Sequence, residues 1–383
     1  MDKTDDPSTN GSSNNVHAAW DRKYSTKMIT LQRGHSQPFT AGRHLGKGGF
    51  GSVHETELDG NVVALKRIWI RGRPSAHHQA EFEILRKMSV RRNQHVVEAI
   101  GFYILPGRPY TELGLLVWPV AQYDLARLLS HIDILHKVNL KSLSTRLTFP
   151  FELVDDEKDA LEDLSILAQQ PWDVAAWYQP TERPQLLESL LVKTTARLTR
   201  AFGCLARAVE YLHDDQQIRH KDLKPSQVLL SSDGLWVTDF GWSVDITSLS
   251  SSATSNGDKT TTRYHAPERE KRGRCGRSED IFGLGCVYVE MALTLCGVGT
   301  EPCLNPEGQK IWSFQSNLDQ TSRWLGNVSG ELADLCPLIH QMLEYEATQR
   351  PIISEVVSRL SKHKTSSSVT EYFASCCMAG MRI

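Results

Sequence analysis

The first third of the chain carries a strand pattern. From residue 39 to about residue 70, apolar positions surround a glycine-rich turn and end in the β-branched run VVALKRIWI. The apolar runs VVEAIGFYIL and LGLLVWPVA follow as further strand candidates. Residues 75–88 instead place their apolar side chains at helical spacing. The pattern predicts a small, mainly antiparallel sheet accompanied by one helix.

Beyond Asp124 the apolar positions change to a helical period. Leucine and other apolar residues recur at steps of three and four between residues 187 and 212, which is typical of an amphipathic helix. Residues 130–185 show no steady period and contain the acidic run DDEKDALED, so we interpret them as an insertion. Together the two patterns predict an α+β fold, with a small sheet-rich part and a larger, mainly helical part.

Both ends of the chain are polar. Residues 1–38 begin with MDKTDDPSTNGSSNN, which lacks the apolar region of a secretory signal, and we expect a flexible tail there. Residues 361–383 form a second tail. The most apolar stretch, residues 281–298, contains Glu290 and several glycines, which favours a buried helix over a membrane span. We therefore expect an intracellular protein, cytoplasmic or nuclear.

Charge and cysteine content narrow the function further. Lys and Arg number 43 against 45 for Asp and Glu, giving a formal net charge of -2, so no global basic field attracts nucleic acid. The eight cysteines include no CxxC pair, which suggests neither a zinc site nor a compact disulfide framework and favours reduced thiols. With 40% hydrophobic residues, the chain can bury the cores of a globular enzyme.

A glycine-rich segment is the first candidate for phosphate binding. Gly46, Gly48 and Gly51, followed by Val53, fit the pattern GxGxxGxV, in which missing Cβ atoms let backbone N–H groups approach phosphate oxygens. A structural turn, a Rossmann loop and a nucleotide-covering hairpin all share such glycines. A Rossmann loop should open a helix and meet an acidic residue about 20 positions later. Here the residue 20 positions after Gly46 is Lys66, in a predicted strand, which favours the hairpin.

Lys66 is the matching candidate cation. A lysine on a strand supplies a point charge for the α- and β-phosphates and needs a carboxylate to hold it in place. On the helix predicted over residues 75–88, Glu81 is the best candidate for that carboxylate. Glu83 is the alternative, but on a regular helix it faces away from Glu81.

Two later segments carry a family resemblance. They read IRHKDLKPSQVLL from residue 218 and VTDFG from residue 237, followed by APE at 266–268 and RP at 350–351. In this order, together with the glycine-rich segment and VALK, they resemble the eukaryotic protein kinase family over residues 39–360. The resemblance implies a bilobal fold, with the N-lobe and hinge over residues 39–121 and the C-lobe over residues 122–360.

The resemblance also implies catalytic roles. Asp222 would orient the hydroxyl of the substrate, Lys224 would contact the transferring phosphoryl group, and Asp239 would hold Mg²⁺ on the phosphates of ATP. The DLKP sequence resembles the members that act on Ser or Thr of protein substrates. The family's structural residues correspond to Glu268, which would pair with Arg350, and to Asp280, which would brace the catalytic loop.

The adenine site is implied by the same alignment. Apolar residues that would sandwich the ring are Val53, Ala64 and Leu229. Residues from Pro119 to Ala121 resemble the hinge that binds the edge of adenine. By the same spacing Trp118, or a residue one or two positions away from it, would stand at the back of the pocket. Ordinary core packing explains these apolar residues nearly as well.

Two positions depart from the family pattern. Gln227 stands where the family has a metal-binding Asn, and the added methylene moves the amide oxygen by roughly 1.5 Å. Lys221 replaces the usual Arg and loses the bidentate fork for a phosphorylated activation segment, although hydroxyls are dense over residues 247–262. Two functions therefore remain: an active Ser/Thr protein kinase, and a pseudokinase-like ATP-binding scaffold or regulatory protein with little transfer.

Overall fold

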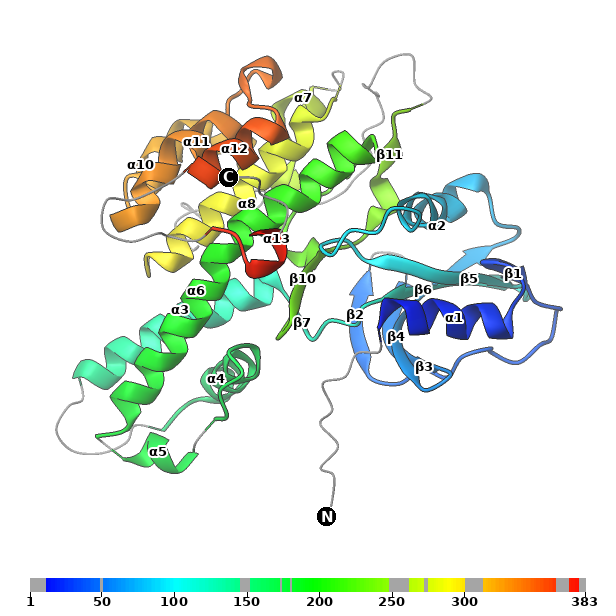
Figure 1. Ribbon diagram of the computed structural model, residues 1–383, viewed down its shortest axis with the longest axis horizontal. Coiled ribbons are helices and arrows are strands. Elements are labelled where there is room, and N and C mark those ends of the chain that lie inside the picture. The colour runs from blue at the N-terminus through cyan, green and yellow to red at the C-terminus, as the bar shows by residue number, and fades with distance from the viewer. Residues whose placement is uncertain are drawn as a thin grey trace. The chain divides into compact units, whose positions relative to one another are not determined.

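The computed structural model describes residues 12–48, 51–144, 152–172, 174–179, 181–247, 262–271, 275–299, 313–362 and 372–378. The chain divides into two compact units. The first unit contains the residues up to Gln122 together with Thr238–Gly241, and the second contains Tyr123–Val237 and the residues from Trp242 onward. Each unit has its own secondary structure (Figure 1).

A six-stranded sheet forms the centre of the first unit (Figure 1). Its strands are β1 (Met28–Thr30), β2 (His44–Gly48), β3 (Gly51–Leu58), β4 (Asn61–Arg71), β5 (Glu98–Leu105) and β6 (Tyr110–Trp118). They lie in the order β1-β5-β6-β4-β3-β2, and every neighbouring pair is antiparallel except β1 and β5. The described helices of this unit are α1 (Ser13–Lys23) and α2 (Ala76–Met88). The predicted sheet and the helix over residues 75–88 are present.

The two faces of this sheet have different surroundings, because side chains alternate along each strand. Ala64 and Lys66 of β4 point to one face, and Val53, which pairs with Lys66 across the antiparallel ladder, points to the same face. Leu65 points to the opposite face and joins a buried cluster that includes residues of α1. The members of this α1 cluster are Val16, Ala19, Trp20, Phe39, Leu58, Val63, Leu65, Ile100, Tyr103 and Leu116.

Helix α1 corrects the expectation that residues 1–38 form a flexible tail. Its sequence SNNVHAAWDRK has a narrow apolar stripe at positions i, i+3 and i+4, formed by Val16, Ala19 and Trp20. All three are at most 1% exposed, because the stripe packs on the sheet. Gly101 makes room for the indole ring, since a Cβ there would lie 2.3 Å from Trp20. The apolar positions in this segment are too sparse for the sequence to reveal this helix, and residues 1–11 lie outside the described part of the chain.

Helices dominate the second unit (Figure 1). They are α3 (Leu125–Ser144), α4 (Asp155–Leu167), α5 (Val174–Tyr178), α6 (Arg183–Glu210), α7 (Pro267–Glu270), α8 (Ser278–Leu295), α10 (Thr321–Leu325), α11 (Cys336–Met342), α12 (Ile353–Lys362) and α13 (Ser375–Met378). Short strands β7 (Tyr123–Asp124), β9 (Val228–Ser231) and β10 (Gly234–Val237) form one antiparallel sheet, and β8 (Ile218–Arg219) pairs with β11 (Val244–Asp245). The α+β class, with a sheet-rich unit and a mainly helical unit, is confirmed.

The segment interpreted as an insertion, residues 130–185, is more regular than its sequence suggested. Helix α3 continues through its first part to Ser144, and α4 and α5 occupy much of the remainder. Helix α4 packs against α3 and buries Ala160, Leu161 and Leu164. Leu164 follows Ala160 by four positions and Leu161 by three, which is helical spacing. The acidic residues between these positions made the apolar stripe hard to recognise in the sequence.

Helix α8 agrees with the expectation of a buried helix over the most apolar stretch. All of its residues except the first and the last are buried, including Glu290. None of the helices in the described ranges is long and apolar enough to cross a membrane.

Candidate active site

The glycine-rich segment is a hairpin between β2 and β3. Strand β2 ends at Gly48 and β3 begins at Gly51, while residues 49 and 50 lie outside the described residues. A Cβ at Gly51 would lie 1.8 Å from the carbonyl oxygen of Arg67, so only glycine fits this close approach of two strands. At Gly46, which pairs with Val53, a Cβ would meet nothing within 4 Å. Because a strand follows the glycines, the Rossmann alternative is excluded.

Apolar side chains accompany Lys66 on its face of the sheet. Val117 of β6 pairs with Ala64, so both project from the face that Lys66 and Val53 share. Trp118 is the next residue along β6 and packs against the α1 cluster on the opposite face. The expectation that Trp118 stands at the back of an adenine pocket is therefore wrong, because alternation along the strand gives that face to Val117.

A three-residue ionic cluster joins β4, α2 and the segment Thr238–Gly241 within the first unit. The Nζ atom of Lys66 lies 2.8 Å from both carboxylate oxygens of Glu81 and 2.8 Å from Oδ1 of Asp239. The side chains are only 22%, 13% and 34% exposed, so solvent screens these ion pairs weakly. The contact expected between Lys66 and Glu81 is present, whereas Glu83 pairs with the exposed Arg86 instead.

Electrostatics keep Lys66 a cation. Burial alone would lower the pKa of Lys66, but the carboxylates of Glu81 and Asp239 outweigh it and raise the pKa above its ordinary value. Asp239 has a φ of 63°, in the left-handed region that residues other than glycine adopt infrequently. Such backbone conformations concentrate at functional sites, where surrounding contacts hold them in place.

The residues predicted as the hinge follow β6 at the end of the first unit. Pro119 and Val120 are buried and Ala121 is half-buried. Proline has no N–H group, so Pro119 can offer only its carbonyl to a ligand. The N–H donors of this segment must therefore come from Val120 and Ala121.

Asp280 organises the predicted catalytic loop of the second unit. Its carboxylate accepts hydrogen bonds from the backbone N–H groups of His220 (2.8 Å) and Lys221 (2.7 Å). It also lies 2.8 Å from Nε2 of His213, which projects from the π-helical turn that follows α6. Although burial alone would raise the pKa of Asp280, His213 and the backbone donors keep it below its ordinary value. The bracing role implied for Asp280 has this geometry, but sequence reasoning missed His213 because 67 positions separate the two residues.

Asp222 and Lys224 lie together on this loop. Nζ of Lys224 donates to Oδ2 of Asp222 at 2.7 Å, and both side chains are largely buried. The loop thus presents a carboxylate and an ammonium group as neighbours. A carboxylate can accept a proton from a hydroxyl, and an ammonium group can neutralise phosphate charge.

Gln227 and Leu229 follow the loop. Gln227 ends a 3-10 turn that starts at Pro225, and its backbone N–H donates to the carbonyl of Lys224 at 2.9 Å. Leu229 lies on β9, where it pairs with both Asp124 and Trp236, and is half-buried. The local backbone around Gln227 is therefore fixed relative to the Asp222 loop.

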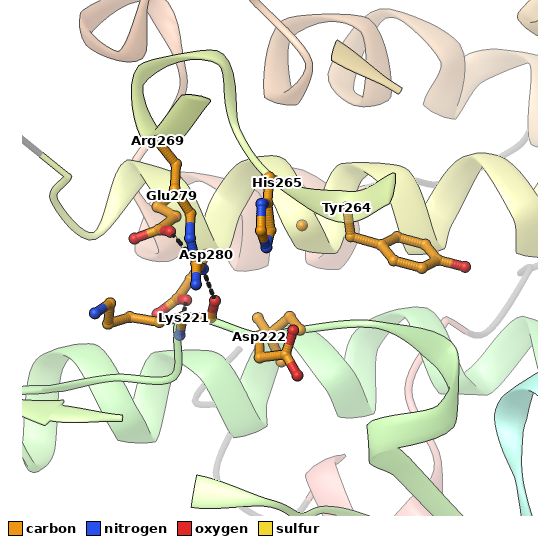
Figure 2. A pocket seen from close by; sticks show the side chains of 9 residues that line it. Lys221, Asp222, Tyr264, His265, Arg269, Glu279 and Asp280 are labelled. Carbon is orange, nitrogen blue, oxygen red and sulfur yellow. Dashed lines mark hydrogen bonds and ion pairs between the residues drawn. The ribbon is translucent and has the colours of Figure 1, made fainter. Parts of the chain in front are cut away.

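A buried ion pair also supports the loop (Figure 2). Arg269 of α7 donates to the carbonyl of Lys221 and pairs with Glu279 of α8 at 3.0 Å. Together with Asp222 and His265, these residues line a small cavity. Burial lowers the pKa of Lys221 from its ordinary value. Sequence reasoning missed Arg269, for which the only signal was its position directly after APE.

Glu268 and Arg350 make the contact that the resemblance implied. The two terminal nitrogens of the guanidinium, Nη1 and Nη2, donate to Oε1 and Oε2 of Glu268, each at 2.8 Å, which makes a bidentate pair. Arg350 is fully buried at its side chain, so this pair fixes α7 to the segment before α12. We assign this pair a structural role.

The hydroxyl-rich activation segment falls mostly outside the described residues. Residues 248–261 belong to the part that the structure does not describe. Thr247, just before them, donates its hydroxyl to Oδ1 of Asp245 at 2.7 Å. Modification of this segment therefore stays a hypothesis from the sequence.

Comparison with known proteins gives one family and several relatives. Residues 178–360 match the family described as protein kinase domain. The chain is 32% identical over 155 residues to mitogen-activated protein kinase kinase 2 of Arabidopsis thaliana, covering 38% of the chain and 41% of that relative. It is 38% identical over 124 residues to mitogen-activated protein kinase kinase SIPKK of Nicotiana tabacum, covering 32% and 33%. It is 31% identical over 166 residues to serine/threonine-protein kinase VIK of Arabidopsis thaliana, covering 42% and 36%. The chain thus spans less than half the length of each of these relatives.

Proposed function

We propose that the chain is a eukaryotic protein kinase that transfers the γ-phosphoryl group of ATP to Ser or Thr hydroxyls of protein substrates. Its match to the protein kinase domain over residues 178–360 and its similarity to plant kinases support this proposal. The observation that carries this proposal is the ionic cluster in which Glu81 holds Lys66 beside Asp239. Protein kinases require this lysine–glutamate pair and a metal-binding aspartate, because the protein contributes mainly positioned charge to phosphoryl transfer.

ATP binding rests on backbone groups and apolar side chains. The β2–β3 hairpin offers N–H groups to the phosphates, since Gly46, Gly48 and Gly51 carry no Cβ that would keep them away. Lys66 binds the α- and β-phosphates. The residues assigned to adenine are Val53, Ala64, Leu229, Pro119 and Ala121.

The donor atoms of Asp239 and Gln227 suit Mg²⁺. This ion takes oxygen ligands at about 2.0–2.1 Å, and the two residues offer a carboxylate and an amide oxygen. When bound, Mg²⁺ neutralises charge on the β- and γ-phosphates. Lys66, whose pKa is raised above its ordinary value, places a cation 2.8 Å from the Asp239 carboxylate within the first unit.

Asp222 and Lys224 act on the transferring group. Asp222 orients the substrate hydroxyl and accepts its proton, while Lys224 stabilises the charge that spreads over the phosphoryl oxygens. Their 2.7 Å contact keeps the two groups adjacent before substrate binds. Asp280 acts on them only through the backbone of His220 and Lys221.

Gln227 favours a second candidate function, an ATP-binding scaffold with little transfer. Its side chain is one methylene longer than the Asn that the family pattern has at this position. Mg²⁺ demands near-ideal octahedral geometry, and a displacement of about 1 Å can cost about 10²-fold in rate. This candidate keeps ATP binding and loses the chemical step.

Transfer of labelled phosphate distinguishes the two candidates. The full chain is incubated with γ-labelled ATP, Mg²⁺ and generic protein substrates, beside an Asp222→Asn control. The proposed function predicts label on Ser or Thr of the substrate, identified by phosphoamino-acid analysis, and none with the control. ATP binding without transfer above the control would support the scaffold, and label on tyrosine alone would reject the Ser/Thr assignment.

Gln227→Asn is expected to preserve activity or to raise it by up to about 10²-fold, because it restores a metal ligand of the usual reach. The measurement is kcat at several Mg²⁺ concentrations. Gln349→Asn, at an exposed position, is the matched control for the same chemical change and should have no effect. A large loss of kcat in Gln227→Asn alone would show that the site is built around glutamine.

A further inference from the structure

Three cysteine sulfurs meet in the second unit. Cys204 lies on α6, and Cys376 and Cys377 are adjacent on α13. The Sγ atoms of Cys204 and Cys377 are 3.8 Å apart, and all three sulfurs lie within 4.8 Å of one another. Cys204 and Cys377 are buried and Cys376 is exposed. The sequence could not reveal this cluster, because 173 positions separate Cys204 from Cys377.

The chain next to these cysteines is fixed by contacts that do not involve sulfur. Gly203 donates its backbone N–H to the carbonyl of Tyr372 at 2.8 Å. A Cβ at Gly203 would lie 2.4 Å from the Phe373 ring, so this glycine forms the slot in which the segment before α13 docks. Tyr372 and Phe373 are 1% and 4% exposed, and Phe373 also lies under the guanidinium of Arg207. Side-chain packing therefore sets the positions of the sulfurs.

The spacing of the sulfurs fits a shared metal ion better than a disulfide. A disulfide requires an S–S distance of about 2.0 Å. Adjacent residues also have Cα atoms about 3.8 Å apart, less than the roughly 4.4 Å that an ordinary disulfide needs, which disfavours a bond between Cys376 and Cys377. Two thiolates on one tetrahedral Zn²⁺, each at about 2.3 Å, are separated by about 3.8 Å. The distance between Cys204 and Cys377 has this value.

We propose that Cys204, Cys376 and Cys377 form a Zn²⁺ site that fastens the C-terminal helix α13 to α6. Soft thiolate ligands select Zn²⁺ over the hard Mg²⁺ used with ATP, so the two ions do not compete for one site. The three sulfurs supply three of the four ligands that a tetrahedral Zn²⁺ takes. The site is structural, and Zn²⁺ that binds only the folded state raises the free energy of unfolding by RT ln(1 + c/Kd), where c is the free Zn²⁺ concentration.

Co²⁺ titration tests the site without relying on activity. The full chain is stripped with a chelator, kept reduced, and titrated with Co²⁺, whose tetrahedral thiolate complexes absorb visible light. We expect a single equivalent to bind with this absorption and to be displaced by Zn²⁺. Cys376→Ser should weaken binding by more than about 100-fold, the upper range for loss of a supporting contact. Because Cys376 is exposed, this variant leaves the core unchanged.

Cys296→Ser is the matched control, since Cys296 is half-exposed and lies at the end of α8. It should bind Co²⁺ as the unmodified chain does. Zn²⁺ should also raise the unfolding temperature of the unmodified chain and of Cys296→Ser, but not of Cys376→Ser. The proposal is overturned if the reduced chain binds Co²⁺ no better than Cys376→Ser, or if a Cys204–Cys377 disulfide forms and the reduced protein binds no metal.

Discussion

Replacement of Lys66 by methionine is expected to abolish phosphoryl transfer while leaving the protein folded. The Lys66 ammonium group is the cation that Glu81 holds beside Asp239, at 2.8 Å from each. Methionine keeps the length and apolar stem of the side chain but removes the charge. Loss of one preorganised electrostatic contact in a reaction centre costs about 10²–10³-fold in kcat. We expect at least this loss, since Lys66 also positions Asp239.

Because Lys66 stays protonated, the loss of kcat in Lys66→Met should not depend on pH between 6.5 and 8.5. The pKa of Lys66 is raised in the folded state, so this lysine remains charged well above neutral pH. The contribution of its charge to stability is lost only as the pH rises through the pKa of the folded state. The ratio of kcat between the unmodified chain and Lys66→Met should therefore be the same at pH 6.5 and pH 8.5.

Lys137→Met provides the matched control for the loss of a lysine. Lys137 is exposed on α3 of the second unit. Activity, ATP affinity and unfolding temperature are measured for both variants. The expected result is a lost kcat for Lys66→Met with a similar unfolding temperature, and no change for Lys137→Met. Near-normal kcat in Lys66→Met would show that the assigned role of this cluster is wrong.

The ionic cluster illustrates how much of the site local sequence could specify. A strand lysine and a helix glutamate 15 positions later were enough to predict the Lys66–Glu81 contact, because alternation and helical spacing fix where each points. The contact from Lys66 to Asp239 spans 173 positions and has no local signal. Only the motif order pointed to Asp239 as a member of the site.

The error at Trp118 has a different cause. The prediction placed Trp118 by its distance along the sequence from the hinge. The face of the sheet on which a strand residue lies depends instead on the register of strand pairing. A shift of one residue reverses the face. Here Val117 pairs with Ala64, which fixes the register, and Trp118 therefore lies on the opposite face, where it packs against the α1 cluster.

Helix α1 was missed because its burial depends on the sheet and not on its own sequence. Three apolar side chains in an otherwise polar segment cannot be separated from a disordered tail by composition. The space that accepts Trp20 is created by Gly101, 81 positions further along the chain. A glycine in a strand often marks such a close approach, but the sequence does not say what approaches it.

Trp20→Ala is expected to lower the free energy of unfolding by about 3–5 kcal/mol, the usual range for removing a buried large aromatic side chain. Trp20 is 0% exposed, stacks near Phe39, and donates its indole N–H to the carbonyl of Thr26 at 2.9 Å. Urea unfolding followed by circular dichroism measures the change. Trp69→Ala is the control, because Trp69 lies on β4 of the same unit but is 46% exposed, and it should cost less than about 1 kcal/mol.

A second substitution tests whether the loss comes from docking of α1 on the sheet. Gly101→Ala places a Cβ 2.3 Å from the Trp20 ring and should destabilise the unmodified chain by about 1–3 kcal/mol through overpacking. In the Trp20→Ala background the clashing ring is absent, so the same change should cost much less. The difference between the two backgrounds is the coupling free energy of Trp20 with Gly101. If Gly101→Ala costs the same in both, or if Trp20→Ala costs less than about 1 kcal/mol, helix α1 is not an integral part of the first unit.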